Sequence, residues 1–572
     1  MKERIDINPV FTIILLLAFI LLVKIGSAEV QPWDEGLYAI RAQSILYHDD
    51  ACFDQSAYSP GGLYSGTYPP LTVWAVAAAM AVFGESEFSL RLFSALCSLA
   101  SLVLISLIAK RIAAGDNWIA APVILFVSLA WNTYSRQGMT DVPLVFFFLV
   151  CFYSVVRGME SDSKKEIFLW ALVFMLGFSG ALLTKIVKSL LPLLFLVLLF
   201  ANKGYLRQKL LFSAMGFAGL LIGSSWYFFM ALWHGADFAG ALLVPHIYTV
   251  VEGNTKGLGI LYYLNQIIIS NPLFLFTVAF VVIAAFNMKW RIFRNDARDF
   301  IYLSCIFWFA GVFLVFSVSA TKLYHYTVYL LPSLSILSVV YHEKHEEFFS
   351  KPKLLLILYF LLLPALAWSM SPSLRIELKS VLAGGFSPQV IIFMLVTGAA
   401  VLVPLAFNPD NSKRLKQAVQ TKLPLVILAA LFFRIVLFNA LPGQGFSGGA
   451  KALSVSISKF QSDRFIYVYH SFTPADSLNP QLAWYSGDYI RGWTGEKGYI
   501  PIGLNKNTFD LKSLRIIDNY PEYPLIYYIS DDKKLTAKVI RDIMETRNPV
   551  RKEKNYVLFG IKRYDRNKGI TI

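Results

Sequence analysis

The chain of 572 residues has little charge: Asp, Glu, Lys and Arg make up 16% of it, whereas 56% is hydrophobic. That balance excludes an ordinary soluble globule, in which about a quarter of the residues are charged. Only four cysteines occur, three of them within apolar stretches, so no disulfide framework is expected. Internal repeats are absent, as are long basic runs with interleaved aromatics, and despite a net charge of +15 we expect no nucleic-acid partner.

Long apolar runs fill most of the chain instead, and they predict a polytopic α-helical membrane protein with about thirteen transmembrane helices. The first run, 10–23, is interpreted as an uncleaved anchor, although Gly26-Ser27-Ala28 resembles a signal-peptidase site. An outer segment over 28–87 with interfacial helices, one of them over 71–83, follows it. The later spans are expected near 88–109, 117–135, 142–157, 167–184, 189–202, 210–231, 272–288, 300–319, 323–341, 353–370, 387–407 and 423–440.

Lys and Arg concentrate in alternate loops, such as 110–111, 203–209, 289–298 and 413–416. Because basic loops stay on the cytoplasmic side, this pattern places the N-terminus in the cytoplasm and the C-terminus outside. We therefore expect a multi-pass plasma (inner) membrane protein with a transmembrane domain over 1–440. Residues 441–572 are expected to form a small extracytoplasmic α/β domain, with strands at 465–469, 525–529 and 556–561 and a helix over 535–544.

The outer segment carries two adjacent carboxylates, Asp34 and Glu35, in the stretch Trp33-Asp34-Glu35-Gly36-Leu37-Tyr38. Ionisable groups at membrane depth are costly unless paired or facing a wet cavity, so they are functional candidates. Alternation of the spans brings further polar residues to the same outer side. They are Tyr38, Arg41, Tyr68, Arg91, Arg136, Asp141, Lys185, Lys188, His246, Glu252, Lys256, Lys322, Tyr324, His325 and Tyr326.

Several short motifs occur in an order that resembles the GT-C membrane glycosyltransferases. They are Asp34-Glu35 with Tyr38, Tyr68-Pro69-Pro70-Leu71, Arg136-Gln137-Gly138-Met139-Thr140-Asp141, Leu183-Thr184-Lys185 and Lys322-Leu323-Tyr324 with Leu331-Pro332. The resemblance covers roughly 10–340 and is to the aminoarabinose transferase and protein O-mannosyltransferase branch. It implies an inverting enzyme that moves a sugar from a polyprenyl-phosphate donor to an extracytoplasmic glycolipid, glycan or protein acceptor.

The resemblance implies roles for individual residues. Asp34 matches the first-loop carboxylate and would be the general base, and Asp141 matches the second; each also suits a helix start. The substrate-binding candidates are Glu35, Tyr38, Tyr68, Arg136, Lys185, Lys188, Lys322 and Tyr324. For the three lysines, the alternative is to anchor a span by snorkelling. His246 matches a histidine position in the long outer loop of aminoarabinose transferases, and the resemblance leaves three roles for it: a ligand of a divalent metal cofactor, a structural histidine or a substrate contact.

Two departures separate the chain from aminoarabinose transferases. Leu37 stands where they carry a basic residue, and Thr67-Tyr68 replaces their Glu-Lys pair before the double proline. The usual phosphate clamp is missing, so either Arg41, Arg136, Lys185 or Lys322 replaces it, or the donor is recognised differently. The β-trefoil of protein mannosyltransferases is also missing. A lipid-linked glycan flippase and an envelope polymer ligase remain alternative functions.

Overall fold

The computed structural model describes residues 9–344, except 32–33, 57–68, 114–116, 203, 252–258, 260, 272 and 288–296. Beyond them it describes 449–457, 464–469, 484–485, 498–503, 525–528, 541, 544, 547–553, 556–561, 564–565 and 570–571. The expected spans at 353–370, 387–407 and 423–440 lie outside this part, as does nearly all of the expected helix over 535–544.

The described residues between 9 and 344 are mainly helical and begin with the expected anchor and the elements of the outer segment. Those are α1 (Pro9–Leu22), α2 (Asp34–Tyr47), the 3-10 turn η1 (Asp49–Cys52) and α4 (Leu71–Phe83), and the last coincides with the expected interfacial helix. The following elements are α5 (Glu87–Ile112), η3 (Asn117–Ile119), α6 (Ala120–Phe126), α7 (Leu129–Ser135), α8 (Asp141–Glu160), α9 (Lys164–Leu182), η4 (Val187–Leu190), α10 (Pro192–Ala201), α11 (Leu206–His234), α12 (Ala236–Val251), α13 (Tyr262–Ser270), α14 (Phe274–Asn287), α15 (Ala297–Val318), η5 (Tyr324–Tyr329) and α16 (Leu331–Lys344).

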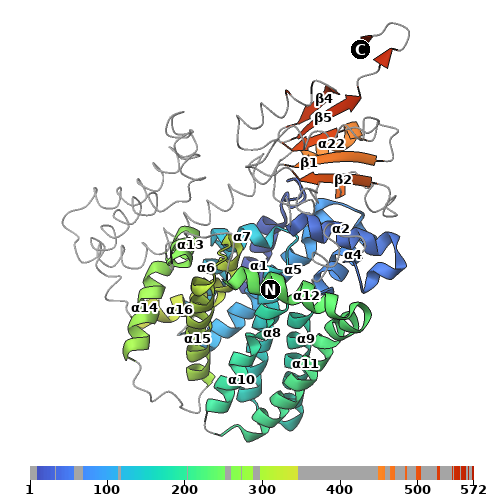
Figure 1. Ribbon diagram of the computed structural model, residues 1–572. Helices are drawn as coiled ribbons and strands as arrows, with labels where there is room; N and C mark the ends of the chain where they lie inside the picture. Colours follow the sequence, from blue (N-terminus) through green and yellow to red (C-terminus); the bar gives the residue numbers. More distant parts are fainter. Residues whose placement is uncertain are drawn as a thin grey trace, which may run out of the picture.

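Five of the described helices are long and apolar enough to cross a membrane, namely α5, α8, α9, α11 and α15. In Figure 1, α8 to α11 and α15 run side by side. Large aromatic side chains pack between α8, α10 and α15. The ring of Phe152 stacks on Phe195 at 4.7 Å, and Trp308 meets both rings edge-on. In α11, only 28% of the most apolar 18-residue stretch is buried. Phe217, Phe228 and Trp233 of this helix are exposed, as expected for side chains that contact lipid.

The expected span over 117–135 is broken into two helices, α6 and α7, that meet at 65°. The break frees backbone groups, which α13 and the residue after it satisfy. Asn271 Nδ2 donates to the Ile124 carbonyl at 3.0 Å, and Ala130 N donates to Ser270 Oγ at 3.0 Å. A break inside a membrane span is stable only with such partners, so α13 fixes the direction in which α7 leaves toward the outer loops.

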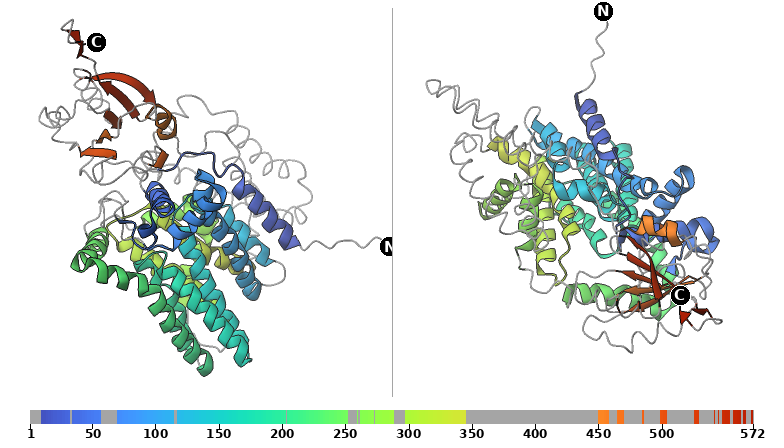
Figure 2. Two further views of the ribbon diagram at one scale, coloured as in Figure 1. Left: turned by 90° about the vertical axis from the view of Figure 1, so that its right-hand side faces the viewer. Right: turned by 90° about the horizontal axis from the view of Figure 1, so that it is seen from above.

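The described part of the C-terminal region contains α22 (Ala450–Ile457) and seven strands. They are β1 (Arg464–Tyr469), β2 (Gly498–Gly503), β3 (Leu525–Tyr528), β4 (Arg547–Glu553), β5 (Tyr556–Ile561), β6 (Tyr564–Asp565) and β7 (Ile570–Thr571). Five form one mixed sheet in the order β2-β1-β3-β5-β4, in which β1 is parallel to β2 and β3, whereas β5 is antiparallel to β3 and β4. Figure 1 and the left view of Figure 2 place the sheet beyond the end of the helical part where α2 and α4 lie.

Candidate active site

Asp141 is the centre of a buried polar cluster at the N-terminal end of α8 and just beyond the C-terminal end of α9. It is the first residue of α8, where the helix dipole favours a carboxylate, and it is fully buried. Its Oδ1 atom accepts hydrogen bonds from Lys185 Nζ at 3.0 Å and from the Tyr329 hydroxyl at 2.6 Å. Its Oδ2 atom is buried and has no hydrogen-bond partner among the described residues. The carboxylate therefore holds one lysine in place and keeps a free acceptor.

Two lysines lie between α9 and α10, and both face this cluster. Burial alone would lower the pKa of Lys185, but the Asp141 carboxylate outweighs it, so this pKa is raised and the ammonium is charged. Lys188 Nζ lies 3.0 Å from the ring centre of Tyr326 and, within the described part of the chain, meets no hydrogen-bond acceptor. Burial, with Lys185 nearby, holds the pKa of Lys188 well below its usual range. The site thus presents a buried amine that meets no hydrogen-bond acceptor there, and an anionic ligand would favour its charged form and supply the missing partner.

Asp34 approaches the cluster from the start of α2. Its side chain is half-buried, and it interacts electrostatically with Lys188 and His325. One turn later, the Tyr38 hydroxyl lies 3.3 Å from Thr140 Oγ1, next to Asp141. The two carboxylates that the sequence singles out, 107 residues apart in the chain, therefore border one cluster.

Aromatic rings of η5 and α7 line the same cluster. The Tyr134 ring lies 5.9 Å from that of Tyr324 and 5.7 Å from His325, and His325 packs edge-on against Tyr326 at 4.6 Å. Of these, only Tyr324 is assigned a role from the sequence. Tyr329 is the contact that sequence reasoning misses, and its signal is the spacing of three residues from Tyr326, which puts both on one side of a 3-10 turn.

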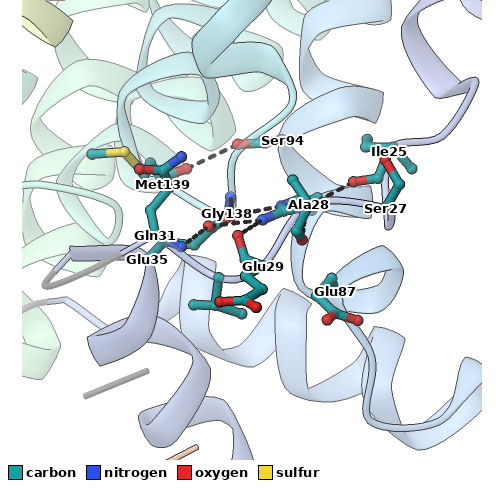
Figure 3. A network of polar contacts seen from close by, with 12 residues as sticks. Ile25, Ser27, Ala28, Glu29, Gln31, Glu35, Glu87, Ser94, Gly138 and Met139 are labelled. Atoms are coloured by element: carbon teal, nitrogen blue, oxygen red, sulfur yellow. Dashed lines mark hydrogen bonds and ion pairs between the residues drawn. The ribbon is translucent and has the colours of Figure 1, made fainter. Parts of the chain in front are cut away.

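Glu35 lies outside the cluster, in a fully buried network shown in Figure 3. Each carboxylate oxygen accepts one N–H from Arg91 and one from the backbone, at distances of 2.7 to 3.0 Å; the backbone donors are Gly138 and Gln31. Gly138 stands three residues before Asp141, and Glu35 directly follows Asp34. The network therefore links the starts of α2 and α8, and Glu35, a substrate-binding candidate from the sequence, is engaged instead by Arg91 and two backbone amides.

Several of the other predicted binding residues have partners outside the cluster around Asp141. The Arg136 guanidinium donates to the carbonyls of Leu21 and Val23 and so caps the end of α1. Arg41 is buried in α2, 6.0 Å over the Tyr38 ring. Lys322 Nζ donates to the Ser319 carbonyl at 2.7 Å, just before η5. Tyr68 and the side chain of His246 lie outside the described residues.

A metal site is the remaining prediction for this region. The described residues include no group of three His, Cys, Asp or Glu side chains that would hold a metal ion. His246 belongs to α12, but its side chain is outside the described part. A metal bound by His246 therefore stays a prediction.

Part of the chain matches a known protein family. Residues 67–229 match the family model described as dolichyl-phosphate-mannose-protein mannosyltransferase. An uncharacterized protein of Aquifex aeolicus (strain VF5) is 26% identical over 325 residues, which are 55% of this chain and 60% of that protein. The chain thus matches 60% of the length of this curated relative.

Solved structures resemble the chain over almost its whole length. ArnT from Cupriavidus metallidurans bound to undecaprenyl phosphate has a TM-score of 0.65 at 16% identity, covering 96% of this chain and 97% of that one. The archaeal oligosaccharyltransferase AglB from Archaeoglobus fulgidus has a TM-score of 0.52 at 10% identity, covering 98% and 75%. Arabinofuranosyltransferase AftD from Mycobacteria has a TM-score of 0.51 at 11% identity, covering 97% and 40%. The chain is a multi-pass membrane protein with the GT-C glycosyltransferase fold, resembling ArnT.

Proposed function

We propose that the protein is an inverting glycosyltransferase that moves a sugar from a polyprenyl-phosphate donor to an extracytoplasmic glycolipid, glycan or protein. The observation that carries the proposal is Lys188, a buried amine that lacks a hydrogen-bond acceptor in the described structure and faces Asp34 beside the Asp141–Lys185 pair. A phosphate would supply the missing anion. In keeping with this, the ArnT structure holds undecaprenyl phosphate, and the AglB structure holds dolichol-phosphate.

The reaction needs a base and a place for the departing charge. The acceptor oxygen forms a bond to the anomeric carbon while the bond from that carbon to the phosphate oxygen breaks. Asp34 takes the hydroxyl proton as general base, and the polyprenyl phosphate leaves with one more negative charge. Lys185 and Lys188 stabilise that charge, and in a dry site such stabilisation is stronger than in water. Asp141 orients Lys185 rather than touching the sugar.

The remaining assignments of the proposal follow the outer-face arrangement. Tyr38 and Tyr324 border the donor site, with Tyr68, Lys322 and a metal at His246 as further proposed contacts. About thirteen spans, a transmembrane domain over 1–440 and an extracytoplasmic α/β domain over 441–572 belong to the proposal as well. The five-stranded sheet supports the α/β domain over 441–572. We also propose a plasma (inner) membrane location with the N-terminus in the cytoplasm, because the basic residues lie in alternate loops.

The test measures release of polyprenyl phosphate by the purified full chain in lipid nanodiscs. The probes are radiolabelled undecaprenyl-phosphate mannose, glucose and aminoarabinose, with an envelope glycolipid extract as acceptor. We expect Asp34→Asn to lower kcat by about 10²–10⁴-fold, as removal of a general base does. Asp141→Asn should also lower the rate, because it releases Lys185. Asp49→Asn, an exposed acid of the same outer segment, is the matched control and should leave the rate unchanged.

Other outcomes identify other functions. Movement of these lipids across a vesicle membrane without turnover would point to a flippase. Turnover only with lipid-diphosphate oligosaccharides would point to a polymer ligase. Equal rates for wild type and Asp34→Asn would refute the role of Asp34 as base.

A further inference from the structure

Contacts between the C-terminal region and the helical part converge on Tyr485. Its hydroxyl accepts a hydrogen bond from Val30 N at 2.9 Å and donates one to Glu87 Oε1 at 2.9 Å. Val30 is fully buried in the linker between α1 and α2, and Glu87 is the first residue of α5. Burial holds the pKa of Tyr485 above its usual range, so the hydroxyl keeps the proton that it donates. One side chain therefore joins the linker to α5.

Two further contacts from the same region surround this bridge. Lys451 of α22 forms an ion pair with Glu87 Oε1 at 2.7 Å. Gly449 N donates to the Glu29 carboxylate at 2.9 Å. Glu29 and Val30 are adjacent, so the C-terminal region holds two successive linker residues and the start of α5 together.

Arg91 holds the linker from the other side, one turn after Glu87 on α5. It donates to the carbonyls of Ile25, Ala28 and Glu29, each at 2.9 Å, in the network of Figure 3. The linker is thus clamped between Arg91 and the C-terminal region. Asp34 begins α2 four residues after Val30, so a displaced linker displaces the carboxylate.

We propose that Tyr485 is a positioning residue for Asp34: through Val30 and Glu87, the C-terminal region holds the linker where α2 presents that carboxylate to Lys188. The proposal rests on the proposed function, because it assigns the C-terminal region a part in the same reaction. Misplacement of a reacting group by about 1 Å costs up to about 10²-fold in rate. Loss of the Tyr485 hydroxyl therefore acts on kcat through Asp34, while donor binding at the lysines continues.

The experiment compares Tyr485→Phe with wild type in the full chain, using the undecaprenyl-phosphate sugar that gives turnover. Ser454→Ala is the matched control, because the Ser454 hydroxyl bonds to the Lys451 carbonyl within the same C-terminal helix. We expect Tyr485→Phe to lower kcat about tenfold with an unchanged KM for the donor, and Ser454→Ala to change neither. In an Asp34→Asn background, the same Tyr485→Phe change should have no further effect on the residual rate.

Hydrogen exchange provides a readout that does not depend on turnover. Without the hydroxyl, the amide of Val30 loses its acceptor, and peptides covering residues 24–31 should exchange faster in Tyr485→Phe than in either wild type or Ser454→Ala. If wild type is active and Tyr485→Phe has the same kcat, the positioning role is overturned while the proposed function stands. The positioning role is also overturned if Tyr485→Phe lowers kcat by the same factor in the Asp34→Asn background as in wild type, because the hydroxyl then does not act through Asp34. A wild type without turnover on any polyprenyl-phosphate sugar overturns both proposals.

Discussion

Replacement of Glu35 by Gln is expected to loosen the outer segment strongly. The Glu35 carboxylate is fully buried, and the Arg91 side chain is 3% exposed. Removal of the negative charge leaves a nearly buried guanidinium without the carboxylate that is hydrogen-bonded to it, and only the more distant Glu87 remains as a negative charge. Breaking a buried ion pair in this way costs about 3–5 kcal/mol.

The hydrogen bonds lead to the same expectation. The carboxylate accepts four hydrogen bonds, two on each oxygen, whereas an amide offers one oxygen and turns N–H groups toward the other two donors. Arg91 uses all its N–H groups in five hydrogen bonds, to Glu35 and to three linker carbonyls. Arg91→Lys keeps the charge but loses at least two of these bonds, and at about 1.5–3 kcal/mol each the loss is again about 3 kcal/mol or more.

The assay is native-state hydrogen exchange of the peptides that cover the linker and α2. A loss of about 3–5 kcal/mol in local stability raises opening, and hence exchange, by about two to four orders of magnitude. Glu160→Gln is the matched control, because Glu160 pairs with Arg111 where the two side chains are 28% and 18% exposed. Such a partly exposed pair contributes only about 0–1 kcal/mol. Exchange in Glu35→Gln no faster than in Glu160→Gln would refute the reasoning.

Two further predictions concern the donor site and helix packing. Burial keeps the pKa of Lys188 low in the free protein, and a bound phosphodiester would raise it, so donor binding takes up a proton between these two pKa values. Between these two pKa values, the dissociation constant of the donor should rise with pH by up to about tenfold per pH unit. This pH dependence should vanish in Lys188→Met. A pH-independent dissociation constant in wild type contradicts the role of Lys188. Gly219→Ala would place a Cβ 2.9 Å from the Met175 carbonyl oxygen of α9, whereas a Cβ at Gly240 meets nothing within 4 Å. Gly219→Ala should lose about 1–3 kcal/mol of stability and melt at a lower temperature than the control variant Gly240→Ala. Equal melting temperatures of the two variants would contradict the close approach of α9 and α11.

The sequence by itself determined the class of the protein and the position of many elements. Apolar runs locate α5, α8, α9 and α11 within a few residues, because a helix in lipid must satisfy its own backbone groups over a fixed length. The positions of Asp34 and Asp141 at helix starts also follow from local pattern. Both features depend only on residues that are close together in the sequence.

Only the tertiary structure decided which polar residues meet. From sequence, Arg136, Lys185 and Lys322 are equal candidates for a phosphate, yet Arg136 caps α1, Lys322 reaches the Ser319 carbonyl, and Lys185 pairs with Asp141. Tyr329 reaches Asp141 across 188 residues of chain, and Tyr485 reaches Val30 across 455. Periodicity tells which face of a helix is apolar, but the partner of a buried charge depends on how separate helices rotate and pack. That choice is made by three-dimensional distance, which no local pattern records.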